Sequence, residues 1–306
     1  MNTASSAGAH APAATFLCGL LGSGIGGSRS PFMHETEAYA LGLPLVYRIL
    51  DGAVMGYGEA DLPRILAMLG HMGFAGVNVT HPFKQAVVPL MDRLSDAARA
   101  LGAVNTVVWG PDGVLGDNTD WSGYRAHFLD GLGDKPRDTV ALIGAGGAAA
   151  AVGFAHLDLG AQDLRIHDAE MSRAEALADR LGALFPMARV TASANAAAAI
   201  EGADGAAQTS PVGMLGHPGV PFDTDLLDAA MWVSDIIYFP ERTQLLDQAA
   251  ARGCATLGGG GMAVLQAAHA FALFTGHQPD SARMMRAFNS NCLLYTSDAA
   301  DEGLGV

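Results

Sequence analysis

Cysteine is scarce in this chain of 306 residues, and the three cysteines present lie far apart, at Cys18, Cys254 and Cys292. An odd number of distant cysteines, in no metal-ligand spacing, supplies neither a disulfide framework nor a zinc site. We therefore expect reduced thiols, no bound metal and a cytoplasmic protein.

Positively charged residues are fewer than negatively charged ones, and long hydrophobic runs are lacking. Lys and Arg number 17 against 31 Asp and Glu, which gives a formal net charge of −14. Such a chain repels phosphates, so we expect no nucleic-acid partner. No apolar run reaches the ~20 residues that a membrane helix requires, so we expect no membrane insertion. An anionic substrate would have to be held locally, by hydroxyls, amides or a lysine.

The two ends of the chain contain little that predicts structure. Residues 1–14 are rich in Ala and Ser, without a basic start or an apolar core, so we interpret them as a loose leader. Residues 293–306 begin with Leu-Leu-Tyr-Thr-Ser-Asp-Ala-Ala-Asp-Glu, which reads back as the codons of a transposon-end adapter from sequencing-library preparation. We interpret them as an artefactual tail, with an ordinary polar tail as the alternative. Without the tail's acidic residues the net charge is still −11.

Between these ends, short apolar stretches alternate with helical segments, which is typical of an α/β fold with mostly parallel sheets. The length predicts about two domains, and the polar linker Gly133–Asp138 lies near their boundary. We expect two α/β domains with a cleft between them. A discontinuous substrate-binding domain comprises residues 15–123 plus 262–292, and a Rossmann-type, parallel-sheet nucleotide domain comprises residues 124–261.

The first domain is organised around Asn78-Val79-Thr80-His81-Pro82-Phe83-Lys84-Gln85. Because a proline lacks an amide hydrogen and disfavours helical backbone before it, this stretch predicts a strand end followed by a helix from Lys84 to about Met91. A lysine there can face a cleft, and an amine partly removed from water can carry protons near neutral pH. For the pattern alone, a solvated lysine at a helix start is the alternative.

Two serines precede a helix that we expect to begin at Pro31. Ser28 and Ser30 are two residues apart, so in extended backbone both hydroxyls point the same way. Together with a helix N-terminus they could bind a carboxylate. The alternative is that Ser30 is simply the N-cap of the helix.

In the second domain, the apolar strand Thr139–Ile143 runs into Gly144-Ala145-Gly146-Gly147-Ala148-Ala149, and a helix and a strand ending at Asp168 follow. This order is typical of a dinucleotide-binding fold, in which glycines let the pyrophosphate approach the backbone at a helix N-terminus. A carboxylate at position 168 can accept both ribose hydroxyls of NAD and would repel the 2′-phosphate of NADP. NAD is therefore the expected cofactor, and NADP is the alternative. Asp168 could instead cap the helix expected at Ser172–Leu184.

Two later loops could also meet a ligand. Thr209-Ser210-Pro211-Val212-Gly213-Met214 follows a strand, and the glycine-rich loop Gly258–Met262 precedes a helix expected at Ala263–Phe274. Glycines allow backbone to approach a flat ligand, and Met262 can lie against a ring. Gln266 could point back into the cleft, or it could be an exposed helical glutamine.

Together these motifs resemble the shikimate dehydrogenase family. The resemblance covers about Thr15 to Asn291, with the motifs in order and at comparable spacings. The matching segments are Ser28–Pro31, Asn78–Lys84, Gly102–Thr106, Asp117–Asp120, the Gly144 loop, Ser210–Met214 and the glycine-rich loop leading to Gln266.

The resemblance implies an oxidoreductase of the shikimate pathway, with Lys84 and Asp120 as its catalytic pair. Which of the two carries the proton stays open, since a charged Lys84 could instead orient the hydroxyl and stabilise an alkoxide. Ser28 and Ser30 are implied for the substrate carboxylate. The positions implied for the ring hydroxyls and the pocket wall are Asn78, Thr80, Asn105, Gln266 and Tyr238. The positions implied for the cofactor are Gly144, Gly146, Gly147, Ala148, Asp168, Ser210, Val212, Gly259 and Met262.

Some residues depart from the usual biosynthetic form and resemble the quinate/shikimate dehydrogenase branch, which tends to use NAD. Asp168 and Ala169 replace an Asn-Arg pair whose arginine reads the NADP phosphate. His81 replaces a small apolar residue, and Trp121 stands where glycine is common. His81 could reach the additional hydroxyl of quinate, or it could be packed or solvent-facing.

We therefore expect an NAD-preferring dehydrogenase that interconverts shikimate with 3-dehydroshikimate, quinate with 3-dehydroquinate, or both. An NADP-dependent shikimate dehydrogenase of aromatic amino acid biosynthesis is the alternative. A non-catalytic paralogue that senses the acid or the nucleotide is the distant alternative. The sequence leaves the oligomeric state open between a monomer and a homodimer.

Overall fold

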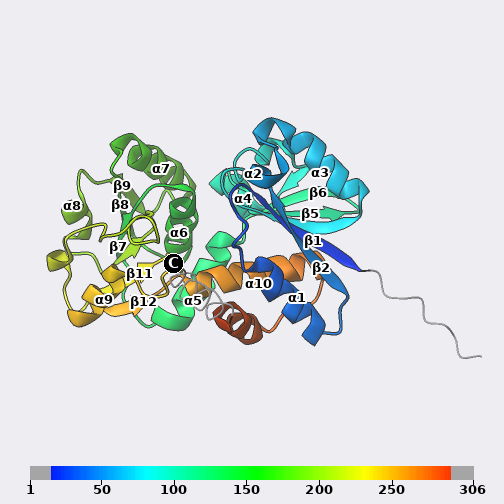
Figure 1. Cartoon of the computed structure of the whole chain (residues 1–306). Helices are drawn as coiled ribbons and strands as arrows, with labels where there is room; N and C mark the ends of the chain where they lie inside the picture. Colours follow the sequence, from blue (N-terminus) through cyan, green and yellow to red (C-terminus); the bar gives the residue numbers. More distant parts are fainter. Residues whose placement is uncertain (1–14, 291–306) are drawn as a thin grey trace, which may run out of the picture.

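The computed structural model describes residues 15–290, so the expected leader and tail lie outside the described residues. Figure 1 shows two lobes side by side, and each is built on a six-stranded sheet. The predicted class, two α/β units with parallel-strand sheets, is confirmed. Within the described part of the chain, no helix is long and apolar enough to cross a membrane.

The first lobe contains a mixed sheet in the order β2-β1-β3-β5-β6-β4. β1 is parallel to β2 and β3, whereas β5 is antiparallel to both of its neighbours. The strands are β1 (Phe16–Gly22), β2 (Leu45–Asp51), β3 (Phe74–Val79), β4 (Arg93–Leu94), β5 (Thr106–Gly110) and β6 (Gly113–Asp117). The helices are α1 (Ser30–Ala40), α2 (Gly52–Met55), η1 (Glu59–Asp61), α3 (Leu62–His71), η2 (Val88–Leu90) and α4 (Asp96–Leu101).

The second lobe contains a sheet in the order β12-β11-β10-β7-β8-β9, with all its pairs parallel. Parallel strands covered on both faces are apolar throughout, and here Val140, Leu142 and Leu164 are fully buried. The strands are β7 (Thr139–Ile143), β8 (Asp163–His167), β9 (Arg189–Ala192), β10 (Gly205–Gln208), β11 (Trp232–Asp235) and β12 (Ala255–Leu257). The helices are α6 (Gly147–Asp158), α7 (Met171–Leu184), α8 (Ala196–Ile200), η3 (Thr224–Leu226) and α9 (Gln244–Ala251).

Two helices, α5 (Asp120–Leu132) and α10 (Gly260–Thr275), pack against each other between the lobes (Figure 1). Their close approach depends on glycine. A Cβ on Gly123 would lie 2.6 Å from the backbone nitrogen of Gln266, and one on Gly261 would lie 2.1 Å from the ring of His127. This packing fixes the start of α5 relative to the first turns of α10.

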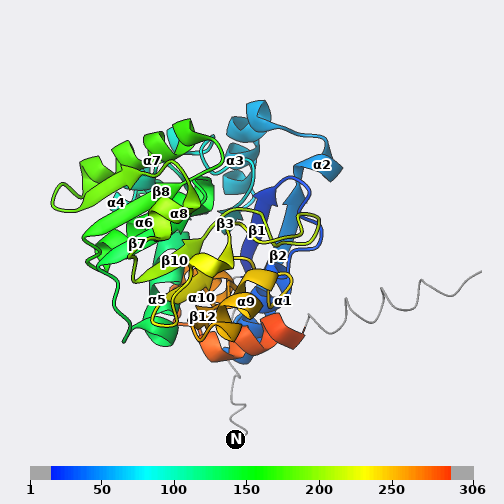
Figure 2. The same cartoon turned by 90° about the vertical axis from the view of Figure 1, so that its left-hand side faces the viewer.

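The helical residues 281–290 pack against α1 and α10, as Figure 2 shows from the side. Arg283 forms two hydrogen bonds with the carboxylate of Glu37 on α1, of 2.6 and 2.8 Å. Glu37 is fully buried, and a two-pronged arginine–carboxylate contact is directional as well as strong. The C-terminal helical residues are therefore held in a defined position beside α1.

The helix expected at residues 84–91 is wrong. The chain there forms turns and then the short 3₁₀ helix η2. Pro89 cannot donate a backbone hydrogen bond, so a regular helix is interrupted soon after it starts. Phe83 and Val87 are buried in the core of the first lobe, which directs the turns inward.

Two other local predictions also require correction. The backbone of Arg29 is helical (φ −84°, ψ −4°), not extended, and α1 begins at Ser30. Gly260, Gly261 and Met262 belong to α10 and not to a preceding loop. Gly261 is required there by close packing against His127, and not by loop flexibility.

Candidate active site

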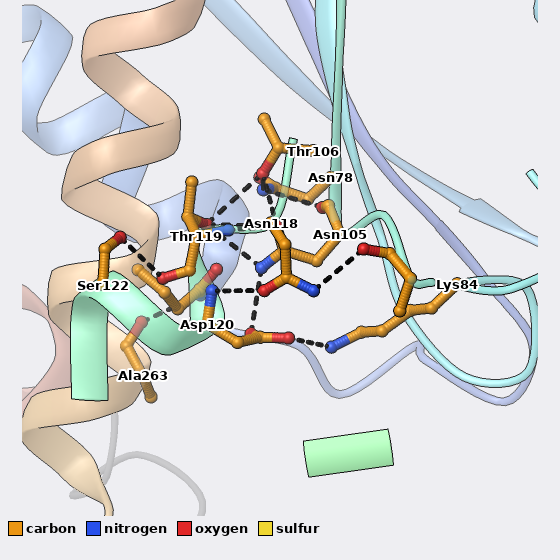
Figure 3. A network of polar contacts seen from close by, with 11 residues as sticks. Asn78, Lys84, Asn105, Thr106, Asn118, Thr119, Asp120, Ser122 and Ala263 are labelled. Atoms are coloured by element: carbon orange, nitrogen blue, oxygen red, sulfur yellow. Dashed lines mark hydrogen bonds and ion pairs between the residues drawn. The ribbon is translucent and has the colours of Figure 1, made fainter. Parts of the chain in front are cut away.

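Lys84 and Asp120 meet at one end of the first sheet, as Figure 3 shows. Lys84 lies in the turns after β3, and Asp120 is the first residue of α5. The lysine Nζ lies 2.6 Å from the aspartate Oδ2, and the two side chains are 28% and 12% exposed. An amine and a carboxylate at this distance, with limited access to water, can hold or move a proton at a bound hydroxyl.

The carboxylate of Asp120 is oriented by Asn105. The amide nitrogen of Asn105 donates to Asp120 Oδ1 over 2.9 Å, while its oxygen accepts the backbone N–H of Thr119 over 2.7 Å. Asn118 Oδ1 in turn accepts the backbone N–H of Asp120. Asn105 is 2% exposed. Asp120 is therefore held by Asn105 at one carboxylate oxygen and by Lys84 at the other. The direct contact of Asn105 with a ring hydroxyl stays a prediction.

Asn78 belongs to the same network, and a tyrosine that the sequence analysis did not identify holds it. The hydroxyl of Tyr47 donates to Asn78 Oδ1 over 2.8 Å, and Asn78 Nδ2 donates to Thr106 Oγ1 over 3.3 Å. Burial raises the pKa of Tyr47 well above its ordinary value, although a hydrogen bond with Ser30 opposes this shift. Tyr47 is therefore a neutral hydroxyl that connects Asn78 to the start of α1. A tyrosine in a half-buried strand was the signal, since a buried hydroxyl needs a partner.

The two serines come together at the start of α1, although the backbone between them is helical. Ser28 Oγ lies 3.2 Å from Ser30 Oγ, and it also accepts the backbone N–H of Ser30. Thr80, the other predicted hydroxyl, is partly buried, and its backbone N–H donates to Leu21.

A cavity of about 830 Å³ lies between the lobes. The first lobe contributes Ser28 and Ser30, and α10 contributes Gln266, whose Nε2 donates to the carbonyl of Ala263 in its own helix. Neither Lys84 nor Asp120 is among the described residues that line the cavity. The link between the pair and the cavity is α5: Asp120 is one helical turn before Gly123, which packs on Gln266 of the lining. The lining residues from the second lobe are Thr209, Ser210, Pro211, Met214, Leu215, Ile236, Ile237, Tyr238 and Phe239.

Tyr238 and Phe239 reach the cavity through a loop that Asp235 holds. The carboxylate of Asp235 accepts the backbone N–H of Ile237 over 3.0 Å and the hydroxyl of Thr243 over 2.7 Å. Asp235 is 2% exposed, and burial raises its pKa to about 6 against the opposing effect of these hydrogen bonds. Tyr238 itself is half-exposed and packs edge-on against Phe288.

The glycine loop after β7 has the geometry that a pyrophosphate needs. Gly144 has a positive φ of 106°, and a Cβ there would lie 2.8 Å from the backbone nitrogen of Ser210, so this turn requires glycine. A Cβ on Gly146 or Gly147 would meet nothing within 4 Å. These two glycines face open space at the start of α6, whose N-terminus has no side-chain cap. Ala148 follows within its first turn. The residues present therefore fit a dinucleotide, which would lie against the backbone there.

Asp168 follows β8 and contacts this loop. Its Oδ2 accepts the backbone N–H of Ala145 over 2.7 Å, and its Oδ1 accepts that of Glu170 over 2.9 Å. The N-cap of α7 is Glu170, so Asp168 is not the cap of that helix. Arg173, the nearest following cation, forms an ion pair of 2.7 Å with Glu170.

The loop that contains Ser210 and Val212 is held by a buried glutamine that the sequence analysis did not identify. Gln208, fully buried at the end of β10, donates to the hydroxyl of Ser210 over 2.9 Å and to the carbonyl of Val212 over 2.9 Å. A polar residue that ends an apolar strand was the only signal.

Four remaining predicted positions lie outside these networks. A Cβ on Gly259 would lie 2.0 Å from the carbonyl oxygen of Ile236, so close packing requires this glycine. Met262 is buried in the apolar core of the second lobe, and its contact with a cofactor stays a prediction. His81 is exposed, whereas Trp121 is partly buried and packs edge-on against Phe154.

Comparison with known proteins agrees with this geometry. Residues 20–107 match the model of the shikimate dehydrogenase substrate binding domain, and residues 259–287 match that of the shikimate 5′-dehydrogenase C-terminal domain. Shikimate dehydrogenase (NADP(+)) of Streptomyces avermitilis is 45% identical over 273 residues, which cover 89% of this chain and 94% of that protein. Quinate/shikimate dehydrogenase (NAD(+)) of Corynebacterium efficiens is 43% identical over 279 residues, which cover 90% of this chain and 98% of that protein.

A solved structure is similar over the same extent. Quinate dehydrogenase from Corynebacterium glutamicum in complex with NAD superposes with a TM-score of 0.85 and 42% identity, covering 90% of this chain and 99% of that one. Taken with the sequence relatives, this likeness shows that the chain belongs to the shikimate dehydrogenase family, a family of oxidoreductases.

Proposed function

We propose that this protein is an NAD-preferring dehydrogenase that interconverts shikimate with 3-dehydroshikimate, quinate with 3-dehydroquinate, or both. The observation that carries the proposal is the contact between Lys84 and Asp120, 36 residues apart, beside a cavity between the lobes. Relatives of both kinds, named for shikimate with NADP and for quinate/shikimate with NAD, support the reaction class.

In this proposal the pair takes up the proton of the ring hydroxyl. Bound NAD would accept the hydride from the carbon that carries this hydroxyl. Lys84 Nζ and Asp120 Oδ2 share a hydrogen bond, so a hydroxyl bound beside them can transfer its proton to the pair as a unit. Asn105 keeps the other carboxylate oxygen in place, which limits the reorganisation that the proton transfer requires.

The substrate would be held mainly by hydroxyls and amides. Ser28 and Ser30 would bind its carboxylate at the start of α1, and the 3.2 Å between their hydroxyl oxygens supports this proposal. Gln266 lines the same cavity, and Asn78 is held by Tyr47 with its amide in the adjoining network. With Thr80 and Tyr238, these residues form the proposed site for the ring and its hydroxyls.

The preference for NAD is supported by charge at the end of β8. A carboxylate at position 168 suits two ribose hydroxyls and opposes a 2′-phosphate. Ala169 supplies no cation, and Arg173 is already paired with Glu170. Position 169 is where an NADP-dependent relative would need an arginine.

The test is a matrix of initial rates with shikimate and quinate, each with NAD and NADP. We expect kcat/KM with NAD to exceed that with NADP by about tenfold or more, because a like-charge contact costs several kcal/mol and about 1.4 kcal/mol corresponds to a factor of ten. A strong NADP preference without quinate turnover would instead identify an NADP-dependent shikimate dehydrogenase. Binding of acid and nucleotide without any turnover would identify a sensing paralogue.

We further propose that the protein works in the cytoplasm. Cys18 and Cys254 are both buried and unpaired among the described residues, and burial raises the pKa of Cys18 to about 12. Such thiols stay protonated and unreactive.

A further inference from the structure

One arginine lies in the wall of the cavity, between the two serines proposed for the carboxylate. Arg29 is the N-cap residue of α1, flanked by Ser28 and Ser30, and all three line the cavity. Among the described residues of the lining, Arg29 is the only one with a charged side chain. In a chain with a net charge of −14, a single cation at this place has a large effect on the local potential.

The guanidinium of Arg29 is held by two aromatic rings. Its Cζ lies 5.5 Å from the ring centroid of Phe239 and 4.9 Å from that of Phe288. Phe239 follows β11 in the second lobe, whereas Phe288 belongs to the helical residues that Arg283 anchors to α1. The arginine therefore contacts two parts of the chain that are far from α1 in the sequence.

Cation–π contacts of this kind restrict how an arginine can recognise a ligand. Aromatic rings contact the flat faces of a guanidinium, while its N–H groups point outward in its plane. One such group, on Nη1, lies 3.5 Å from the carbonyl oxygen of Phe288. A planar cation with restricted orientation is well suited to a carboxylate, which accepts two parallel N–H bonds in the same plane.

We propose that Arg29 is a specificity-determining residue that recognises the ionised carboxylate of the substrate, in addition to the hydroxyls of Ser28 and Ser30. This inference rests on the proposed function. The serines supply hydrogen bonds that an ester could also accept, whereas Arg29 discriminates by charge. The rings of Phe239 and Phe288 keep the guanidinium at the cavity before the substrate arrives, which reduces the ordering that binding requires.

The experiment compares shikimate with its uncharged methyl ester in the wild type, Arg29→Gln and Arg29→Lys. We expect Arg29→Gln to raise KM for shikimate by about tenfold or more, because hydrogen bonds to charged groups are worth about 1.5–3 kcal/mol. KM for the ester should change less than about twofold, and kcat for either compound less than about threefold. Arg29→Lys, which keeps the charge but not the plane, should give an intermediate KM for shikimate.

The matched control is Arg64→Gln. Arg64 lies on α3, its side chain is 78% exposed, and it pairs only weakly, at 3.4 Å, with Asp61. This variant removes the same charge from the chain without touching the cavity, so its KM values should equal those of the wild type. The proposal is overturned if Arg29→Gln leaves KM for shikimate unchanged, or if it weakens acid and ester equally, since Arg29 would then act only by docking the two lobes.

Failure of the proposed function would look different. If the wild type turned over neither shikimate nor quinate, calorimetric binding of shikimate and its ester to the same variants would replace KM as the readout. Tighter binding of the acid by the wild type than by Arg29→Gln would then support the role of Arg29, although the proposed function would be wrong. Equal binding, or no binding of the acid, would overturn it.

Discussion

The two lobes differ in what the polar side chains near the cavity bind. In the first lobe, polar side chains bind one another: Asn105 donates to Asp120, and Asp120 contacts Lys84. In the second lobe, the polar side chains that support the predicted cofactor loops bind mainly backbone. Gln208 holds the loop after β10, and Asp168 holds the glycine loop through the N–H of Ala145.

This difference separates two kinds of recognition. Where side chains meet side chains, the chemistry resides in particular functional groups, and replacing one group removes it. Where side chains hold backbone in place, the ligand meets main-chain amides, which nearly every residue type supplies. We therefore expect substitutions in the first lobe to affect kcat most, and substitutions in the second lobe to affect cofactor choice and stability.

The largest effect should come from Lys84→Ala. Removing the amine deprives Asp120 of its partner at 2.6 Å, and loss of an acid–base group typically lowers kcat by about 10²–10⁴-fold. NAD affinity, measured by fluorescence titration, should stay within about twofold because the nucleotide loop is in the other lobe. Activity near that of the wild type would show that the pair is not catalytic.

A smaller loss of activity should follow from Asn105→Ala. The substitution leaves Asp120 Oδ1 and the buried backbone N–H of Thr119 without their partner. We expect kcat to fall by about 10–100-fold, less than for Lys84→Ala, and unfolding free energy to fall by about 1–3 kcal/mol. Denaturant titration and steady-state kinetics measure both. Thr106→Ser keeps the hydroxyl that donates to Asn105 and is the control, with activity close to the wild type. Unchanged kcat in Asn105→Ala would contradict an orienting role.

In the second lobe, the double change Asp168→Asn with Ala169→Arg should alter cofactor choice and not the chemical step. Asparagine can still accept the N–H of Ala145, while the new arginine can bind a 2′-phosphate. We expect the ratio of kcat/KM for NAD to that for NADP to fall by about tenfold or more, with kcat for the preferred pair little changed. Arg173→Ala, which removes a cation already paired with Glu170, should leave the ratio as it is. The assignment of Asp168 fails if the double variant keeps the wild-type ratio.

The smallest effect concerns stability and pH at Asp235. Burial raises the pKa of this carboxyl from 3.8 to about 6, so between these values the folded protein binds more protons than the unfolded chain. Its contribution to stability therefore falls as pH rises through this window. Asp235→Asn has no such group, so its unfolding free energy relative to the wild type should rise between pH 4 and 7 by up to about 3 kcal/mol. Thermal or urea unfolding at several pH values measures the difference. A difference that does not vary with pH would show that folding does not raise the pKa of Asp235.

Much of the second lobe could be predicted from short stretches of sequence. The glycine loop, the strands on either side of it and the acid at position 168 follow one another along the chain, and each requirement is local. The prediction of a helix from Lys84 was wrong for a reason that is also visible in the local sequence, because Pro89 interrupts such a helix. The family likeness, and not the spacing of residues, indicated that Lys84 and Asp120 form a pair.

The contacts that the sequence did not reveal join residues far apart in the chain. Tyr47 binds Asn78 from another strand of the first sheet. Arg29 contacts Phe288, which is 259 residues later in the sequence. No periodicity predicts such contacts, because they depend on how whole elements pack.

By itself, the sequence determined the α/β class, the glycine-loop position and the residue types available for proton transfer, because backbone preferences and polar–apolar patterns act over a few residues. Only the tertiary structure decided that Asn105 orients Asp120, and that Arg29 is the one charged side chain among the described residues of the cavity wall. The reason is that these contacts depend on how whole elements pack, as α5 and α10 do through Gly123 and Gly261, and not on the residues next to them in the chain.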